Sequence, residues 1–413
     1  MYGLLGKTLG HSFSKQIHQA LSPEITYELL ETKSLKDFIR TIPFKGVNVT
    51  LPYKHEILDL LDYIDPTAKA IGAVNTIVLK DNKLCGYNTD YLALKEIIDN
   101  TYPSNKETVI TILGNGATKG TLMYTLKLLG YQKIHVCARN PKANEHPLTA
   151  IPKESEIIIN ATPVGMYPSN DSHFDIDLNE FPNMKLIHDL VYNPFYTTFI
   201  QQAKSHGIKA LSGLKMLYLQ AYYAQKLFGL SPKKNIDALI EQFKKETLNI
   251  VFIGLPFSGK SHYGRLLAKS IQRPFVDIDN EIENTTNLSI DSIFTIKGES
   301  YFRMIEGQIV QKKAKLHRQI IAPGGGVILN EALMIALKQN SFIIYLDMDD
   351  ALLERINIKG RPLIKSKTDW MLLKENRESL YKHYADAVIR KDTFDEAVIL
   401  KRIEATIDAY FNN

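Results

Sequence analysis

Residues 254–261, with the sequence GLPFSGKS, have the spacing of glycine, lysine and serine that is typical of a phosphate-binding loop. An apolar run of strand length, residues 248–253, precedes the loop, and a helix-like stretch, residues 263–268, follows it. In that context, backbone N–H groups and the positive end of the helix point at a phosphate. The lysine would reach the outer phosphates of a nucleotide, and the serine hydroxyl after it would hold Mg²⁺. The residues predicted to contact the nucleotide are Gly254, Ser258, Gly259, Lys260 and Ser261.

Two carboxylates, Asp277 and Asp279, end the next apolar run at positions i and i+2, so they point to the same side of a strand. One of them could hold the shell of Mg²⁺, and the other could orient or deprotonate a hydroxyl group. Taken alone, two solvated acids at a strand end would explain the pattern equally well. Further groups suited to phosphoryl transfer are Arg303, the glycines at 324–326, Arg361 in a lysine-rich stretch, and Arg377 one helical turn before Tyr381.

A second glycine-bearing loop, residues 114–120, lies between a strand-like run and a helix-like stretch. This is the position of the phosphate loop in a dinucleotide-binding fold, although Lys119 stands where the fingerprint has a third small residue. The next strand-like run ends in Arg139 and carries no acid there. A guanidinium suits the 2′-phosphate of NADP, whereas an acid suits the ribose hydroxyls of NAD. Arg139 therefore favours NADP, unless it is simply a solvated charge at a strand end.

The first hundred residues contain polar groups that could complete the reduction of a ketone. A nicotinamide supplies the hydride, and a lysine beside an aspartate can supply the proton that the developing alkoxide needs. Hydroxyl and amide side chains could bind a polyhydroxylated substrate. By spacing alone, each of these residues is more often a turn or cap residue than a ligand. The runs in question are HSFS at 11–14, NVTLPYK at 48–54, AVNT at 73–76 and GYNTD at 86–90.

Alternating strands and helices must position these groups. Strand-like runs between residues 108 and 211 alternate with helical stretches, which predicts a doubly wound, mostly parallel sheet. A second βαβ series begins at residue 248. We therefore expect an α/β chain with several domains. They are a substrate domain at 1–100 completed by a helix at 213–230, a Rossmann-like NADP-binding domain at 101–212, a linker at 231–247, and a P-loop domain with a parallel sheet at 248–413.

The bulk composition is that of a globular chain with more than one domain. Its 413 residues suggest two or three domains, and its net charge of +5 includes no arginine-rich run. We expect small-molecule partners and no nucleic acid, and an oligomer is compatible with the sequence. Cys85 and Cys137 have no CxxC partner and are expected to be buried thiols. No signal peptide or membrane-spanning stretch is present, so we expect a cytoplasmic location and no membrane partner.

Taken together, the polar runs of the first 230 residues resemble the shikimate dehydrogenase family. HSFS is similar to its HSxSP serines, NVTLPYK to its NVTxPxK segment, and the runs at 72–76 and 86–90 to its GAxNT and GxNTD motifs. NATPVGM at 160–166, DLVYNP at 189–194 and GLKML at 213–217 match later motifs of the family. The resemblance implies reduction of 3-dehydroshikimate to shikimate with NADPH.

The resemblance also implies roles for individual residues. Lys54 and Asp90 would be the catalytic pair. The substrate would contact hydroxyl and amide side chains, namely Ser12, Ser14, Thr50, Asn75, Tyr192 and Gln220. NADP(H) would contact the glycine loop and neighbouring strand ends, namely Gly114, Asn115, Gly116, Ala117, Arg139, Thr162, Met166 and Gly213. The chain departs from the family pattern at Lys15, where proline is usual, and at Ala138, where asparagine is usual.

Residues 248–413 resemble shikimate kinase, a P-loop kinase. The run at 275–306, FVDIDNEIENTTNLSIDSIFTIKGESYFRMIE, follows the family pattern, with Asn287 at a glycine position as the main exception. The motifs GGG, RPLI and RESLY match further along the chain. The resemblance implies phosphorylation of the 3-hydroxyl of shikimate with ATP and Mg²⁺. The chain departs from the family at Phe257, where glycine is usual, and at His262, where threonine is usual.

The kinase resemblance implies a second set of roles. Asp279 would bind the substrate hydroxyl and act as the base, and Asp277 would join Ser261 around Mg²⁺. Arg303 and Arg377 would bind the carboxylate of shikimate. Gly325 and Gly326 would lie against its ring hydroxyls. The remaining roles concern the nucleotide, with Lys260 and Arg361 at the transferring phosphoryl group and Arg355 on the adenine.

The product of the first implied reaction is the substrate of the second, so we predict one bifunctional enzyme of aromatic amino-acid (chorismate) biosynthesis. Three alternatives remain: a quinate/shikimate dehydrogenase that uses NAD, a kinase for another polyol, and a regulator derived from these enzymes. Arg139 disfavours the first, and the two arginines suited to a carboxylate disfavour the second. A decayed regulator would have lost proton-transfer groups, yet Lys54, Asp90, Lys260 and Asp279 are all present.

Overall fold

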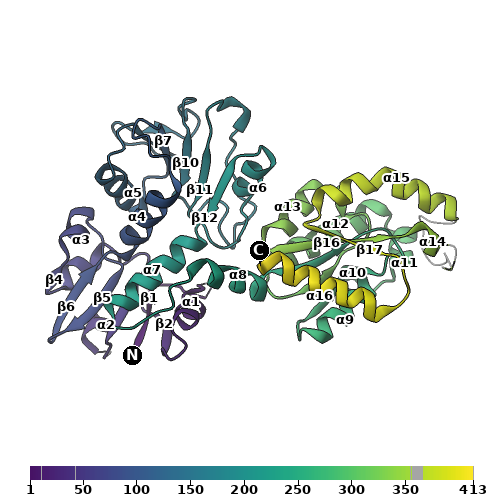
Figure 1. Cartoon of the computed structure of the whole chain (residues 1–413), viewed down its shortest axis with the longest axis horizontal. Coiled ribbons are helices and arrows are strands. Elements are labelled where there is room, and N and C mark those ends of the chain that lie inside the picture. The colour runs from purple at the N-terminus through teal and green to yellow at the C-terminus, as the bar shows by residue number, and fades with distance from the viewer. Residues whose placement is uncertain (11, 42, 354, 356–365, 413) are drawn as a thin grey trace. The chain divides into compact units, whose positions relative to one another are not determined.

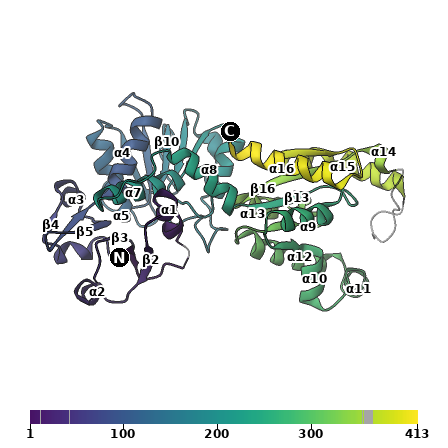
Figure 2. The same cartoon turned by 60° about the horizontal axis from the view of Figure 1, so that its bottom comes forward.

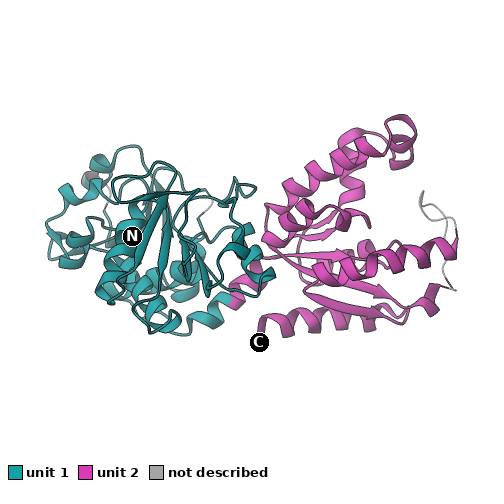
Figure 3. Ribbon diagram, turned by 90° about the horizontal axis from the view of Figure 1, so that it is seen from above, with its two compact units in different colours: residues 1–240 teal, residues 241–413 magenta. Residues whose placement is uncertain are grey.

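The computed structural model describes residues 1–10, 12–41, 43–353, 355 and 366–412. These residues form three β-sheets with helices on their faces (Figure 1), which confirms the predicted α/β class. Two compact units contain the sheets: Met1–Ile240 holds the first two, and Glu241–Asn413 holds the third (Figure 3). The boundary between the units falls inside helix α8 (Ile236–Thr247), within the segment where the sequence predicts a linker.

The first sheet is mixed and has the strand order β2-β1-β3-β5-β6-β4. Strands β2, β1 and β3 run parallel, whereas β5 pairs antiparallel with both β3 and β6. The loops after β1 and β3 therefore leave from the same edge of the sheet, and they carry Ser12 and Thr50. The strands are β1 (Tyr2–Gly6), β2 (Tyr27–Glu31), β3 (Gly46–Val49), β4 (Tyr63–Ile64), β5 (Thr76–Lys80) and β6 (Lys83–Tyr87). The helices are α1 (Ser14–Leu21), α2 (Leu35–Thr41), the 3₁₀ helix η1 (Glu56–Leu60), α3 (Pro66–Ile71) and α4 (Thr89–Thr101).

The second sheet is parallel throughout its described strands and has the order β12-β11-β10-β7-β8-β9. Strand β7 lies at the point where the order reverses, which is where open α/β sheets bind ligands. All residues of β7, β10 and β11 are buried, as expected for a parallel sheet with helices on both faces. The strands are β7 (Ile110–Leu113), β8 (Ile134–Ala138), β9 (His146–Pro147), β10 (Ile157–Asn160), β11 (Leu186–Asp189) and β12 (Lys209–Ser212). The helices are α5 (Ala117–Leu128), the 3₁₀ helix η2 (Leu178–Glu180) and α6 (Thr198–Ser205).

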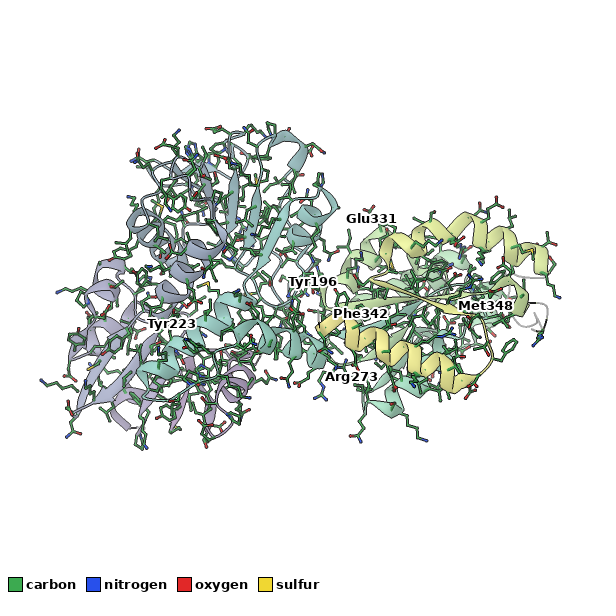
Figure 4. All side chains as sticks on the ribbon, viewed as in Figure 1. Tyr196, Tyr223, Arg273, Glu331, Phe342 and Met348 are labelled. Carbon is green, nitrogen blue, oxygen red and sulfur yellow. The ribbon has the colours of Figure 1, made fainter. Side chains whose placement is uncertain are left out.

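A helix pair connects the layers of the first unit. Helices α4 and α7 (Leu214–Leu227) pack along each other, while α4 also contacts α5 and α7 contacts α1 (Figure 1). Tyr223 of α7, labelled in Figure 4, donates a hydrogen bond of 2.5 Å to Glu96 of α4. Helix α7 therefore completes the first unit, although it follows both sheets in the chain.

The third sheet is also parallel in its described strands, with the order β14-β15-β13-β16-β17. Strand β13 lies at the centre, so the phosphate loop that follows it emerges at a point where the strand order reverses. The strands are β13 (Asn249–Ile253), β14 (Phe275–Asp277), β15 (Ile320–Ala322), β16 (Ser341–Met348) and β17 (Ala387–Lys391).

Helices cover both faces of the third sheet. Helices α9 and α16 contact each other on one face, while α13 and α15 contact β16 on the other, and α10 and α11 lie beside α12 (Figure 2). The fully buried Trp370 and Tyr381 of α15 belong to the apolar core of this unit. The helices are α9 (Lys260–Ser270), α10 (Ile278–Thr286), α11 (Ile290–Ile296), α12 (Glu299–Ala314), the 3₁₀ helix η3 (Val327–Leu329), α13 (Glu331–Gln339), α14 (Asp350–Leu353), α15 (Lys367–Tyr384) and α16 (Glu396–Asn412).

Two smaller expectations can be compared with the structure directly. Cys85 and Cys137 are both free and buried, as predicted. Burial raises the pKa of the Cys137 thiol to about 11, so this thiol is a poor nucleophile. In the part of the chain that the structure describes, no helix has the length and apolar character needed to cross a membrane.

Candidate active sites

Lys54 and Asp90 meet in the first unit. Lys54 lies in the turn after β3, and Asp90 lies in the first turn of α4. Nζ of Lys54 is 2.6 Å from Oδ2 of Asp90, and their side chains are 18% and 13% exposed. The positive end of α4 favours the negative charge of Asp90. The pair thus presents an ammonium group, held by a carboxylate and within reach of solvent, that can donate a proton.

Asn75 is fixed next to this pair by a buried hydrogen-bond network. Its Oδ1 accepts a hydrogen bond of 2.7 Å from the backbone N–H of Thr89, the residue before Asp90. The hydroxyl of Thr76 donates to Oδ1 of Asn75 and contacts the Thr89 hydroxyl, and Asn48 donates to Thr76 at 3.0 Å. Since these groups are buried, each needs a partner, and together they fix the orientation of the Asn75 amide.

Ser12, Ser14 and Tyr192 are also brought together, although Tyr192 comes from the loop after β11 of the second sheet. The Ser12 hydroxyl donates to Oγ of Ser14 at 3.0 Å and accepts from the backbone N–H of Ser14 at 3.2 Å. Burial raises the pKa of Tyr192, and a side-chain hydrogen bond with Ser12 partly offsets this effect. The rings of Phe13 and Tyr192 lie 6.0 Å apart. The two serines therefore belong to a cluster that joins the two layers of the unit.

The remaining expected substrate residues lie on neighbouring elements. Thr50 follows β3, and its methyl group packs against Gly6. A Cβ added to Gly6 would lie 2.7 Å from this methyl group. Gln220 is buried on α7, where its Nε2 donates to the carbonyl oxygen of Leu217. Among the described residues, no hydrogen bond joins the Gln220 side chain to Lys54, Asp90 or the serines.

The glycine loop after β7 has room for a phosphate group. Gly114 has φ +106°, and a Cβ there would lie 2.7 Å from the Thr162 side chain. Gly116 begins α5 without a side-chain cap, and a Cβ there would meet nothing within 4 Å. Ala117 is the first residue of the helix, so the open backbone N–H groups and the helix dipole fit the pyrophosphate of a dinucleotide.

The end of β8 combines an exposed cation with a carboxylate that the sequence motifs did not single out. Arg139 is exposed directly after β8. Nearby, Glu145 accepts hydrogen bonds from the side chain of Asn115 and the backbone N–H of Lys142, both at 2.9 Å. The Lys142 N–H is the main reason that the pKa of Glu145 is lowered. Lys119, the departure from the glycine fingerprint, lies 3.5 Å from the same carboxylate. Glu145 therefore ties the glycine loop to the loop after Arg139.

The segment after β10 is held by buried polar groups. Asn160 accepts from both the backbone N–H and the hydroxyl of Thr162, and it donates to Asp189 at 2.8 Å. Asp189 also accepts from the Thr197 hydroxyl at 2.6 Å, and burial raises its pKa to about 6. The expected cofactor residue Met166 is 40% exposed on the same loop. Gly213, at the start of α7, lies against the backbone of Leu190. A Cβ added to Gly213 would lie 2.0 Å from the carbonyl oxygen of Leu190.

In the phosphate loop of the second unit, two glycines have backbone angles in the range that favours glycine. Gly254 has φ +151° and Gly259 has φ +96°, and Gly259 begins α9 without a side-chain cap. Nζ of Lys260 donates to the carbonyl oxygens of Gly254 and Leu255 at 2.8 and 3.0 Å. The hydroxyl of Ser258 is buried and has no hydrogen-bond partner among the described residues. The uncapped N–H groups and this hydroxyl fit the phosphates of a nucleotide.

The expectation that Asp277 and Asp279 lie on one side of a strand is wrong, because β14 ends at Asp277 and Asp279 lies in the first turn of α10. Asp277 caps α10 by accepting from the backbone N–H of Asp279 at 3.1 Å, and its second oxygen lies 3.6 Å from Arg265. Asp279 approaches the triglycine loop, where a Cβ at Gly324 would be 3.4 Å from its Oδ1. No cluster of three metal-ligating side chains occurs within the described ranges. A Mg²⁺ ion here would therefore depend on Ser261, Asp277, water and the phosphates.

Glu306 is a functional candidate that the motif reading did not single out. It is 2% exposed on α12, and its Oε2 accepts from Nη1 of Arg303 at 2.8 Å. Burial raises the pKa of Glu306, Arg303 opposes this shift, and Asp279 adds to it. A Cβ at Gly324 would lie 2.9 Å from Oε1 of Glu306, so this oxygen faces the triglycine loop. The i, i+3 spacing of arginine and glutamate on one helix was the available signal.

The triglycine loop is held from the opposite side by α15. Nη1 of Arg377 and the Tyr381 hydroxyl both donate to the carbonyl oxygen of Gly325, at 3.1 and 2.7 Å. A Cβ at Gly326 would lie 2.8 Å from the Arg303 guanidinium, so a larger residue there would displace this side chain. Arg355 is exposed after α14. Arg361 lies outside the described residues.

The folds and sites define a class of protein: a dinucleotide-dependent oxidoreductase with a lysine–aspartate pair, followed by a P-loop phosphotransferase. Comparison with known families makes the class specific. Residues 4–77 match the model of the shikimate dehydrogenase substrate binding domain, and residues 256–408 match the model of shikimate kinase.

Individual relatives match the first part of the chain. The shikimate dehydrogenase (NADP(+)) of Clostridium beijerinckii is 38% identical over 251 residues, which are 55% of this chain and 91% of that protein. A chorismate mutase/shikimate 5-dehydrogenase fusion protein from Clostridium acetobutylicum is 32% identical with a TM-score of 0.54, covering 59% of this chain and 96% of that one. The quinate dehydrogenase of Corynebacterium glutamicum in complex with NAD is 26% identical with a TM-score of 0.53, covering 59% and 97%. The chain thus belongs to the shikimate dehydrogenase family and carries a shikimate kinase domain at its C-terminal end.

Proposed function

We infer that this chain is a bifunctional enzyme that catalyses two consecutive reactions. The first unit reduces 3-dehydroshikimate to shikimate with NADPH, and the second phosphorylates shikimate at its 3-hydroxyl with ATP and Mg²⁺. The contact of 2.6 Å between Lys54 and Asp90, in a chain that also carries an open phosphate loop, is the observation that best supports this function. The two reactions are consecutive, since shikimate is the product of the first and the acceptor of the second.

In the first reaction, NADPH supplies the hydride that reaches the ketone carbon. Lys54 donates a proton to the ketone oxygen as negative charge develops there, and Asp90 keeps the ammonium group oriented. Because the lysine side chain is partly exposed, it can regain its proton from solvent. Asn75 and the Ser12–Ser14 pair would bind substrate hydroxyl or carboxylate groups, with Thr50, Tyr192 and Gln220 around them.

The cofactor would lie along the edge of the second sheet. The uncapped start of α5, with Gly114, Asn115, Gly116 and Ala117, would hold the pyrophosphate. Arg139 would bind the 2′-phosphate, because its guanidinium is exposed at the end of β8. The nicotinamide side of the site would be lined by Thr162, Met166 and Gly213.

In the second reaction, ATP supplies the phosphoryl group. Asp279 would orient and deprotonate the acceptor hydroxyl, while Ser261 and Asp277 would hold Mg²⁺. Lys260 would leave its two backbone acceptors in the loop and bind the outer phosphates. Arg303 and Arg377 would bind the shikimate carboxylate, and Gly325 and Gly326 would lie against the ring hydroxyls. We further assign Arg355 to the adenine and Arg361 to the transferring phosphoryl group.

A coupled assay with single-site variants tests this function. Wild-type protein incubated with 3-dehydroshikimate, NADPH, ATP and Mg²⁺ should form shikimate 3-phosphate, which mass spectrometry can detect. Lys54→Ala should abolish NADPH oxidation and leave the phosphorylation of added shikimate intact. Asp279→Asn should have the opposite effect.

Two results would contradict the proposal. If either variant loses both activities while its circular dichroism spectrum stays native, two independent sites cannot explain the enzyme. A strong preference for NADH and quinate would assign the first unit to the oxidative alternative, which the quinate dehydrogenase relative makes worth testing.

A further inference from the structure

The phosphate loop of the second unit contains a backbone conformation that its sequence does not favour. Phe257 has φ +70°, in the left-handed region. A side chain with a Cβ is rarely stable there, whereas glycine adopts this conformation freely. Since Gly254 and Gly259 of the same loop also have positive φ, Phe257 completes a loop shape that would usually be built from glycines. Some other interaction must hold the loop in this shape.

Two contacts can stabilise the loop at this point. The Phe257 ring is partly buried and packs against the apolar core that includes Leu255 and Trp370. The indole N–H of Trp370 donates a hydrogen bond of 2.9 Å to the carbonyl oxygen of Pro256, the residue before Phe257. Trp370 is fully buried and is the one tryptophan in the sequence. A buried indole N–H without this acceptor would be costly, so the contact constrains both partners.

Trp370 lies on the same face of α15 as two residues that hold the acceptor side of the site. Positions 370, 377 and 381 are separated by seven and four residues, which places them on one stripe of a helix. Arg377 and Tyr381 donate to the carbonyl oxygen of Gly325. A Cβ at Gly325 would be 3.2 Å from the Pro256 ring, so the triglycine loop and the phosphate loop touch. Helix α15 therefore holds both loops from one side.

We propose that Trp370 is a positioning residue for ATP: its indole N–H, together with the packing of Phe257, holds the phosphate loop in the shape that receives the nucleotide phosphates. This inference rests on the proposed kinase activity. In this chain, a tertiary contact replaces the conformational freedom that a glycine at position 257 would give. The effect of Trp370 on ATP passes through the Pro256 carbonyl.

The test uses the full chain and begins with Trp370→Phe, which removes the N–H donor and keeps an apolar ring. The KM for ATP should rise about tenfold, as expected for the loss of one buried hydrogen bond. The KM for shikimate and the rate of NADPH oxidation should not change. A purely structural role for Trp370 would instead lower stability and kcat without separating the two KM values.

The decisive experiment adds a change at position 257. Phe257→Gly in the Trp370→Phe background should restore most of the ATP affinity, because glycine adopts a positive φ without help. Phe257→Ala is the matched control, since it removes the ring but retains a Cβ, and it should not restore the affinity. The same Gly and Ala substitutions in the wild-type background should leave ATP binding intact with Gly and weaken it with Ala. The comparison of Gly and Ala at position 257 in the wild-type background remains valid if Trp370→Phe fails to fold.

The outcomes separate this inference from the proposed function. Calorimetric titration with Mg²⁺–ATP in the absence of acceptor measures the loop without any assumption about shikimate. If wild-type protein binds ATP but does not phosphorylate shikimate, the acceptor assignment fails and the binding constants of the variants still test Trp370. If Gly and Ala at position 257 behave alike in both backgrounds, or if Trp370→Phe changes both KM values equally, the proposal is wrong.

Discussion

Nζ of Lys54 lies 2.6 Å from Oδ2 of Asp90, although 36 residues separate the two in the chain. The antiparallel pair β5 and β6 forms the last part of the intervening sequence and returns the chain to the edge where β3 ends. The turn after β3 therefore positions Lys54, the proton donor of the proposed reduction, and the first turn of α4 positions Asp90. This arrangement predicts that each residue depends on the other.

Asp90→Asn should reduce NADPH-dependent reduction of 3-dehydroshikimate by a factor of about 10² to 10⁴, because the uncharged amide no longer orients the Lys54 ammonium. Steady-state absorbance at 340 nm measures this loss, and the kinase activity of the same chain serves as an internal control. Asp99→Asn is a matched control, since Asp99 forms an exposed ion pair of 2.8 Å with Lys95 on the same helix. Equal losses in both variants would contradict a special role for Asp90.

Arg139→Ser should lower the ratio of kcat/KM for NADPH over NADH by about 10- to 100-fold, because one charge-assisted contact with the 2′-phosphate is lost. The rate with NADH should change little. Lys133→Ser is the control, because Lys133 is an exposed cation just before the opposite end of β8 and pairs with Glu107. A ratio that stays constant in Arg139→Ser would place the phosphate elsewhere.

Glu306→Gln should raise the KM for shikimate by about tenfold and leave the KM for ATP unchanged, because Arg303 loses the buried carboxylate that orients it. Arg303 also pairs with Glu299 at 3.2 Å, but the Glu299 side chain is 56% exposed. Glu299→Gln should therefore have a small effect, since exposed ion pairs contribute little. Isothermal titration with shikimate can compare the two variants. Similar losses of affinity would show that burial of Glu306 is unimportant.

The stability of the first unit should depend on His188 in acid. Burial lowers the pKa of His188 from its ordinary value of 6.5 to about 4, so the folded state keeps it neutral. Below pH 6.5 the unfolded chain binds a proton that the folded chain does not. The stability contribution is therefore complete above pH 6.5 and is lost as the pH falls towards 4. The slope from this residue is at most about 1.4 kcal/mol per pH unit.

His188→Phe should remove that slope. It should also cost roughly 1 kcal/mol at all pH values, because the Tyr102 hydroxyl loses its hydrogen bond of 2.8 Å. Urea unfolding followed by circular dichroism between pH 7 and 4.5 measures both effects. If the free energies of unfolding of wild type and variant fall in parallel with pH, His188 does not account for the acid sensitivity.

The amino-acid sequence predicts those parts of the sites that are contiguous in the chain. The phosphate loop at 254–261 is one example, because its strand, glycines and helix are neighbours in sequence and their geometry is local. The glycine loop after β7 and the position of Arg139 at the end of β8 follow from the same local alternation of strand and helix. The parallel sheets and their buried strands are likewise confirmed, because fully apolar short runs are favourable only between two layers of helices.

Other features depend on contacts between segments that are far apart. The sequence identifies Phe257 as an unusual residue in the phosphate loop, but only the folded chain gives it a positive φ and places Trp370, 113 positions away, against the preceding carbonyl. The partners of Arg303 and Arg377, the position of Glu145 beside Asn115, and the link from Ser12 to Tyr192 are of the same kind. The physical reason is that a buried polar group must find a partner wherever packing places it. Local patterns thus determined which residues can do chemistry, and tertiary packing decided which of them are held together.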